Sequence, residues 1–217
     1  MHFVHAGVFD IVFAASAKYN HQPELTPRPF DEARDGLVVA EGAGTLVLES
    51  LDHAQARGAD ILAELEGYGL SCDGTHVTNP SAEGMGRAMR LALDNAQLDP
   101  QAIDYINAHG TATDVGDIAE SLATHRLFGE RVPFSSTKSF MGHTLGACGA
   151  IEAGICISAL REGFIPPTRN LEKLDERCAP LDYVSGDARQ TRIKRAMSNN
   201  FAFGGIDTSL IFKTFDG

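Results

Sequence analysis

The middle of the chain reads Ser135-Ser136-Thr137-Lys138-Ser139-Phe140-Met141-Gly142-His143-Thr144-Leu145-Gly146. Residues 132–135 before this polar stretch predict a strand, and residues 146–161 after it predict a long helix. That helix is apolar or small on every side, which is typical of a buried helix. A strand, a polar loop and a buried helix in succession indicate a layered α/β fold.

The same alternation of strand and helix extends on both sides of this stretch. Apolar residues recur at helical spacing over 85–96 behind Ser81, a candidate N-cap, and a second helix is expected over 117–128. Asp117 and Glu120 lie near its positive end, where a carboxylate complements the helix dipole. We therefore expect an α/β fold with a layered, mixed sheet and helices on both faces. The expected strands are 61–65, 105–108, 132–135, 196–199 and 208–213.

The first 58 residues do not have the pattern of a complete domain. A lone strand must pair with something, so this segment has the pattern of the end of a unit. We divide the chain into residues 1–58 and residues 59–217. The elements expected in the first part are a short helix over 3–17, a Pro-rich loop over 20–36, a buried strand over 45–48 and a short helix over 52–57.

Composition and charge exclude several classes of protein. The formal net charge of −11 argues against non-specific binding to nucleic acid or to an anionic membrane surface. No apolar run reaches the length of a membrane span, and the N-terminus lacks the pattern of a signal peptide. Cys72, Cys148, Cys156 and Cys178 show no CxxC spacing, which indicates a reduced, cytoplasmic protein.

Two histidines each follow an expected strand. His109 lies in Asn107-Ala108-His109-Gly110-Thr111-Ala112-Thr113, and His143 precedes the buried helix. Active-site residues of α/β sheets gather at the carboxyl ends of strands. The positive end of the helix and Lys138 disfavour protonation of His143, so its imidazole is expected to be neutral near pH 7. Two neutral imidazoles that converge on one oxygen would stabilise an enolate; two unrelated loop histidines are the alternative.

Two further features could belong to a site. Glu152 lies inside the apolar helix, where a buried carboxylate needs a cation such as Lys138 or a bound monovalent ion; a solvent-facing Glu152 is the alternative. The run Ser198-Asn199-Asn200-Phe201-Ala202-Phe203-Gly204-Gly205 indicates either a loop that approaches a ligand closely or an ordinary turn with two core phenylalanines. No metal site is expected, because no His and Cys pair has a matching second half, and no GxGxxG fingerprint occurs.

Several stretches, in their order and spacing, resemble the type II β-ketoacyl-acyl carrier protein synthases, condensing enzymes of the thiolase superfamily. The resemblance runs from about residue 8 to residue 213. It implies a thiolase-like fold of two similar halves, each with a five-stranded sheet between helices. Residues 59–217 would be the C-terminal half, and residues 1–58 the end of the N-terminal half. The stretches that carry the resemblance are 26–31, 34–38, 41–44, 107–111, 136–139, 142–147 and 199–205.

The resemblance also implies a reaction, a decarboxylating Claisen condensation. Malonyl-carrier protein loses CO2, and the carbanion attacks an acyl thioester held on a cysteine. His109 and His143 would bind the malonyl carbonyl and stabilise the enolate, and Lys138 would polarise the site. The remaining implied roles are gating and an oxyanion N–H for Phe203 with Phe201, structure or cation binding for Glu152, Ser198 and Asn199, and contact with the pantetheine arm for Thr111 and Thr113.

Partners follow from the resemblance and from its departures. The family's nucleophile lies in an Asp-Thr-Ala-Cys-Ser turn that this sequence lacks. Cys72 and Cys148 occupy positions where the family commonly has serine and alanine. Gly116 occupies a position where asparagine is common, and Ile206-Asp207 one where Thr-Asn is usual. The chain is thus expected to supply the histidine part of the site and to need the other half or a thiolase-fold partner. Acyl carrier protein brings malonyl and acyl groups on its phosphopantetheine, so no cofactor is expected here, and the whole enzyme would be a dimer. An inactive fragment or a chain-length-factor-like subunit is the alternative, and a zinc-dependent module is a third.

The lack of the nucleophile turn makes a first prediction. Incubation of this chain with a radiolabelled acyl thioester should leave the protein unlabelled, because neither Cys72 nor Cys148 lies in a nucleophile turn. Gel autoradiography measures the label. Stoichiometric labelling of either cysteine would contradict the prediction.

Overall fold

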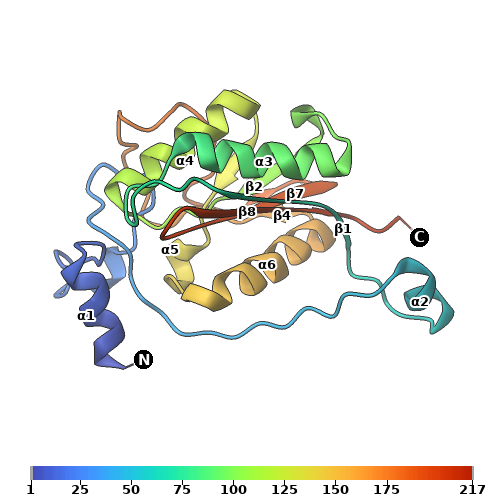
Figure 1. Cartoon of the computed structure of the whole chain (residues 1–217), viewed down its shortest axis with the longest axis horizontal. Helices are drawn as coiled ribbons and strands as arrows, with labels where there is room; N and C mark the ends of the chain where they lie inside the picture. Colours follow the sequence, from blue (N-terminus) through green and yellow to red (C-terminus); the bar gives the residue numbers. More distant parts are fainter. Residues whose placement is uncertain (1, 217) are drawn as a thin grey trace.

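The computed structural model describes residues 2–216 (Figure 1). Its centre is a six-stranded mixed sheet in the order β1-β8-β7-β2-β3-β5, with α3 and α4 on one face and α6 on the other. The expected α/β layers with helices on both faces are therefore confirmed. The elements of these layers are β1 (Glu64–Cys72), α3 (Ala82–Ala96), β2 (Tyr105–Asn107), α4 (Asp114–Phe128), β3 (Pro133–Ser135), α6 (Cys148–Glu162), β5 (Asp182–Tyr183), β7 (Arg195–Ala202) and β8 (Ile206–Lys213).

The sheet contains one strand more than the five that were expected. The additional strand, β5, is two residues long and pairs in parallel with β3 at the edge of the sheet. Strands β7, β2, β3 and β5 are parallel, whereas β8 runs antiparallel to both β7 and β1. The carboxyl ends of β2 and β3 therefore meet at one edge of the sheet, where the two histidine-bearing loops leave it.

Each face of the sheet packs against its helices through a separate apolar core. Ile106 of β2 faces the core beneath α3 and α4, which includes Met89, and the adjacent Tyr105 faces the core beneath α6. This alternation is the period of two that a strand imposes on its side chains. At Gly69 the two layers touch, because a Cβ there would lie 2.0 Å from the carbonyl oxygen of Ala88 in α3. Only glycine fits this approach of β1 to α3.

The first 58 residues differ most from expectation. The expected buried strand over 45–48 is wrong: these residues form an exposed, extended segment that passes along α6 (Figure 1), and Val47 is 80% exposed. The expected helix over 3–17 ends at Ile11. The division of the chain at residue 58 stays a prediction. The remaining elements are α1 (Phe3–Ile11), α2 (Leu51–Ala56), α5 (Lys138–Met141), the short strands β4 (Phe164–Ile165) and β6 (Arg189–Gln190), and single 3-10 turns at Pro23–Leu25, Pro100–Ala102 and Leu145–Ala147.

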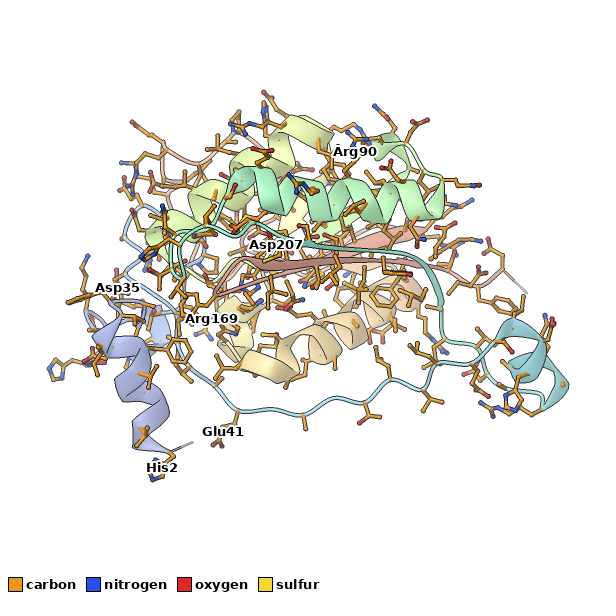
Figure 2. All side chains as sticks on the ribbon, in the orientation of Figure 1. His2, Asp35, Glu41, Arg90, Arg169 and Asp207 are labelled. Carbon is orange, nitrogen blue, oxygen red and sulfur yellow. The ribbon has the colours of Figure 1, made fainter. Side chains whose placement is uncertain are left out.

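Asp207 of β8 is an unusual residue of the core. It is labelled in Figure 2, where it lies between the sheet and α3. Neither of its carboxylate oxygens has a hydrogen-bond partner among residues 2–216, and a Cβ on Gly84 at the start of α3 would lie 2.8 Å from Oδ2. Burial, followed by the negative charge of Asp73, raises the pKa of Asp207 to about 7. The buried carboxylate therefore destabilises the fold wherever it is ionised.

This environment makes a prediction about stability. In the folded protein Asp207 holds a proton that the unfolded chain releases, so stability is lost as the pH rises from the ordinary aspartate pKa toward about 7. Asp207→Asn, which carries no charge, should raise the free energy of unfolding by about 1–3 kcal/mol near pH 8 and by much less near pH 5. Urea denaturation at both pH values measures the difference.

The exposed Asp187→Asn is the matched control for this experiment. It removes the same charge from the surface and should change stability equally little at both pH values. An Asp207→Asn variant that gains the same free energy at low and high pH would show that Asp207 does not take up a proton on folding.

Candidate active site

The two histidines lie next to each other where the loops after β2 and β3 meet. The ring centroids of His109 and His143 are 5.3 Å apart, and the rings are nearly perpendicular, at 86°. Both rings line a cavity of about 980 Å³, whose wall also includes Thr111, Thr113 and Phe201. Two separate loops thus present two imidazoles to one cavity.

His143 is fixed through both its backbone and its ring. Its backbone N–H donates to the carbonyl of Val38 at 2.7 Å, and its carbonyl accepts the N–H of Ala40 at 2.9 Å. Ring Nδ1 accepts the backbone N–H of Leu145 at 3.1 Å. A backbone amide can only donate, so Nδ1 carries the lone pair and Nε2 carries the proton of the neutral ring. Burial, and then the charge of Lys138, lowers the pKa of His143 to about 3.

A buried carboxylate of α4 fixes the loop of His109. Glu120 accepts the backbone N–H of His109 at 2.8 Å and that of Gly110 at 2.7 Å. Gly110 has φ +36°, and a Cβ there would lie 2.5 Å from Cβ of Ser136, so the sharp turn requires glycine. Burial, Lys138 and His143, in that order, hold the pKa of His109 well below its usual range. Ring atom Nδ1 is buried and has no partner in the described part of the chain.

Asp117 holds the next part of the same loop. Its carboxylate accepts the backbone N–H of Ala112 at 3.1 Å and that of Phe30 at 2.7 Å, and it lies 3.6 Å from Nε of Arg34. Burial raises the pKa of Asp117 to about 6 and that of Glu120 to about 8, since the backbone N–H groups offset only part of the desolvation.

The role of these two carboxylates was not expected from the sequence. Asp117 and Glu120 were expected to complement a helix dipole, but both side chains are buried and bind loop backbone. Their spacing of three residues, which places both on one face of α4 directly after the histidine loop, is the signal that could have found them.

Lys138 and Glu152 form an ion pair in the interior. The ammonium Nζ lies 2.5 Å from Oε1 of Glu152, and the two side chains are 1% and 0% exposed. The structure therefore gives Glu152 the lysine as its cation and excludes a solvent-facing carboxylate. Burial raises the pKa of Glu152, and the charge of Lys138 opposes that shift. The pair joins α5 to α6 beside the two histidines.

The two phenylalanines at the end of β7 and in the turn after it differ in exposure. Phe201 is buried with its ring 6.1 Å from that of His109, whereas Phe203 is 44% exposed and its ring lies 5.8 Å from that of Phe9 in α1. Both line the cavity. The turn that carries Phe203 is tied to a neighbouring loop, because Gly204 N–H donates to the carbonyl of Val77 at 3.0 Å.

Of the other expected site residues, some line the cavity and some do not. Thr111 and Thr113 line the cavity, and their hydroxyl oxygens are 2.9 Å apart. Ser198 and Asn199 do not line the cavity, because both are buried within β7. The side-chain Oδ1 of Asn199 accepts the hydroxyl of Ser209 at 2.7 Å. Gly116 lies beside these threonines, where a Cβ would come within 2.4 Å of the hydroxyl of Thr113.

Two of the free cysteines lie near the ends of elements that border this region. Cys72 is exposed at the end of β1, and Cys148 is buried at the start of α6. Within residues 2–216, no group of three or more His, Cys, Asp and Glu side chains is arranged to hold a metal ion. In the same range, no helix combines the length and the apolar character that crossing a membrane requires.

Comparison with known proteins identifies the family. A family profile described as "Beta-ketoacyl synthase, C-terminal domain" matches residues 62–172. The chain is 45% identical over 216 residues to 3-oxoacyl-[acyl-carrier-protein] synthase 2 of Coxiella burnetii, and 44% identical over 206 residues to 3-oxoacyl-[acyl-carrier-protein] synthase 1 of Escherichia coli. These alignments cover 97% and 94% of this chain but 52% and 50% of the relatives, so the chain spans about half the length of the curated relatives it matches.

Solved structures agree with this assignment. A beta-ketoacyl synthase from Burkholderia phymatum superposes with a TM-score of 0.97 and 57% identity, covering 99% of this chain and 52% of that one. The ishigamide ketosynthase/chain length factor superposes with a TM-score of 0.92 and 41% identity, covering 99% of this chain and 52% of that one. The expected thiolase-like ketosynthase fold is thereby confirmed. This chain belongs to the beta-ketoacyl synthase family and corresponds to the C-terminal portion of its members.

Proposed function

We propose that this chain supplies the decarboxylating part of a β-ketoacyl-[acyl carrier protein] synthase site, an acyltransferase of fatty acid or polyketide-like biosynthesis. The observation that carries the proposal is the pair of neutral imidazoles, His109 buried and His143 half-buried, whose ring centroids lie 5.3 Å apart at one cavity. A malonyl thioester carbonyl placed between the rings accepts N–H donors from both sides. No protonated histidine is needed for this step.

The chemistry follows from the charges. When the C–C bond to the malonyl carboxylate breaks, CO2 leaves and the bonding electrons move onto the thioester, whose carbonyl oxygen becomes an enolate oxyanion. The Nε2–H of His143 and an N–H of His109 bind that oxygen more tightly as its charge grows, which lowers the barrier. The enolate carbon then attacks the carbonyl of an acyl thioester, and that thiolate leaves. In this proposal the acyl group is held by a cysteine outside this chain.

Lys138 acts through the field of its charge. It disfavours protonation of both imidazoles and stabilises the oxyanion that forms beside them. Glu152 holds the ammonium group in place. We assign Thr111 and Thr113 to the approach of the pantetheine arm, because their hydroxyls lie on the cavity wall.

Phe203 is assigned to gating, with its turn N–H as an acyl oxyanion donor, because its exposed side chain and Gly205 line the cavity. Phe201 packs beside His109 and shapes the floor. Ser198 and Asn199 keep a structural role inside β7, with no cation assigned to them.

The partners of the proposed reaction are an acyl carrier protein and a thiolase-fold subunit or half. One structural relative is a type II polyketide ketosynthase in complex with its acyl-carrier protein, with 36% identity and a TM-score of 0.93. Exposed apolar side chains outside the cavity, such as Val47 and Leu48, support burial against a further thiolase-fold surface. A non-catalytic, chain-length-factor-like role is a second candidate, favoured by the likeness to a ketosynthase/chain length factor. The presence of His109, His143 and Lys138 beside one another favours catalysis.

The histidine pair predicts the effect of its removal. His109→Ala and His143→Ala should each lower the rate of CO2 release from a malonyl thioester by about 10²–10³, because each removes one oxyanion donor. Measurement of labelled CO2 tests this. His125→Ala, a histidine in the last turn of α4, is the control and should retain the rate of the unmodified chain.

The same assay tests the protonation state of His143. Since its pKa is lowered to about 3, the decarboxylation rate should show no histidine limb as the pH falls from about 8 to about 5. A loss of rate with a midpoint near pH 6.5, the ordinary histidine pKa, would contradict the proposed donor role.

The ion pair predicts a stability effect. Lys138→Met leaves the Glu152 carboxylate buried without a cation and should lower the free energy of unfolding by about 3–5 kcal/mol. The double variant Lys138→Met/Glu152→Leu buries no charge and should recover most of that loss, while the decarboxylation rate stays low. Urea denaturation measures both. Additive losses in the double variant would refute the direct coupling of the two side chains.

A further inference from the structure

Cys148, the first residue of α6, contacts the imidazole of His143. Its Sγ lies 3.2 Å from Nδ1 of His143, and the hydroxyl of Thr144 donates to the same sulfur at 3.5 Å. The thiol is 1% exposed and does not line the cavity. It is therefore buried against the histidine ring and is not presented to a substrate.

The protons around this ring can be assigned one by one. The backbone N–H of Leu145 donates to Nδ1, so that atom is an acceptor. Thr144 donates to the sulfur, which leaves the single thiol proton of Cys148 to point at Nδ1. The lowered pKa of His143 keeps its imidazole neutral, so Nδ1 remains an acceptor.

We propose that Cys148 is a positioning residue for His143: its S–H is a second donor to Nδ1, which holds the ring with its Nε2–H available to the cavity. Its catalytic consequence rests on the function proposed above, whereas the hydrogen bond does not. Two donors at Nδ1 disfavour rotation of the ring, which would replace Nδ1 by a carbon. They also withdraw electron density from the ring and make Nε2–H a stronger donor to an oxyanion.

Substitutions of Cys148 can separate the loss of the S–H donor from a loss of packing. The resembled family commonly has alanine here, so Cys148→Ala is expected to fold and to retain only the Leu145 donor. Cys148→Ser replaces the thiol by a hydroxyl and keeps a donor. Cys156→Ala is the matched control, because it removes a second buried thiol from the same helix, about two turns along α6 from Cys148.

Histidine side-chain ¹⁵N NMR of the full chain tests the hydrogen bond directly. In Cys148→Ala the His143 Nδ1 resonance should move to higher frequency, toward a less strongly bonded ring nitrogen. Cys148→Ser should move it back, and Cys156→Ala should leave it unchanged. An unchanged His143 resonance in Cys148→Ala, or the same displacement in Cys156→Ala, would overturn the proposal.

The catalytic consequence has a separate readout. The kcat for release of CO2 from a malonyl thioester should fall roughly two- to tenfold in Cys148→Ala, with KM unchanged and partial rescue in Cys148→Ser. If kcat is unchanged although the resonance moves, the catalytic part of the inference is wrong. If the unmodified chain and its complexes release no CO2, the proposed function fails, while the NMR result still decides the role of Cys148 as a donor.

Discussion

A buried positive charge is the constraint on which the site depends. The side chain of Lys138 is 1% exposed, so its charge needs the carboxylate of Glu152 as a partner. This ion pair connects α5 to α6. Such a pair is expensive to bury and contributes little net stability compared with an apolar pair of the same shape. Its benefit lies in the field it creates, which disfavours an imidazolium and favours an oxyanion at the same place. Burial of the histidines acts in the same direction, so their neutral form has two independent causes.

Backbone hydrogen bonds turn this field into a defined geometry. Glu120 and Asp117 hold the loop after β2 by its N–H groups, and Val38 and Ala40 hold the backbone of His143. Segments from three parts of the chain therefore set the separation of the two rings. Donors held in this way need little reorganisation when charge develops, which is the usual source of electrostatic catalysis. The network also holds the segment that contains Phe30 and Arg34, since the Phe30 N–H donates to Asp117 and Arg34 donates to the carbonyl of Asp114.

The sequence predicted the parts of the structure that depend on local pattern. The helices and most strands of residues 60–213 have a clear period, and the rule that sites gather at strand ends located both histidines. The exposed segment 45–48 was missed because a β-prone run forms a strand only when a neighbour is there to pair with it. The structural role expected for Asn199 depends on the face to which it points: its amide donates to the sulfur of Met89 in α3, and neither Ser198 nor Asn199 lines the cavity. The bond from the backbone N–H of Phe30 to Asp117 joins residues far apart in sequence, which no local pattern encodes.

The cavity has a polar floor and an apolar rim. The floor determines the reaction, and the rim determines which acyl group fits. Its floor consists of polar groups held by backbone hydrogen bonds, around His109 and His143. Its rim consists of exposed apolar side chains, among them Phe13, which is 94% exposed, and Phe203. A rigid polar floor fixes what happens to a thioester carbonyl regardless of the acyl group behind it. An apolar rim is stable only when another surface covers it, so the acyl group that fits is decided jointly by this chain and by whatever packs on that rim.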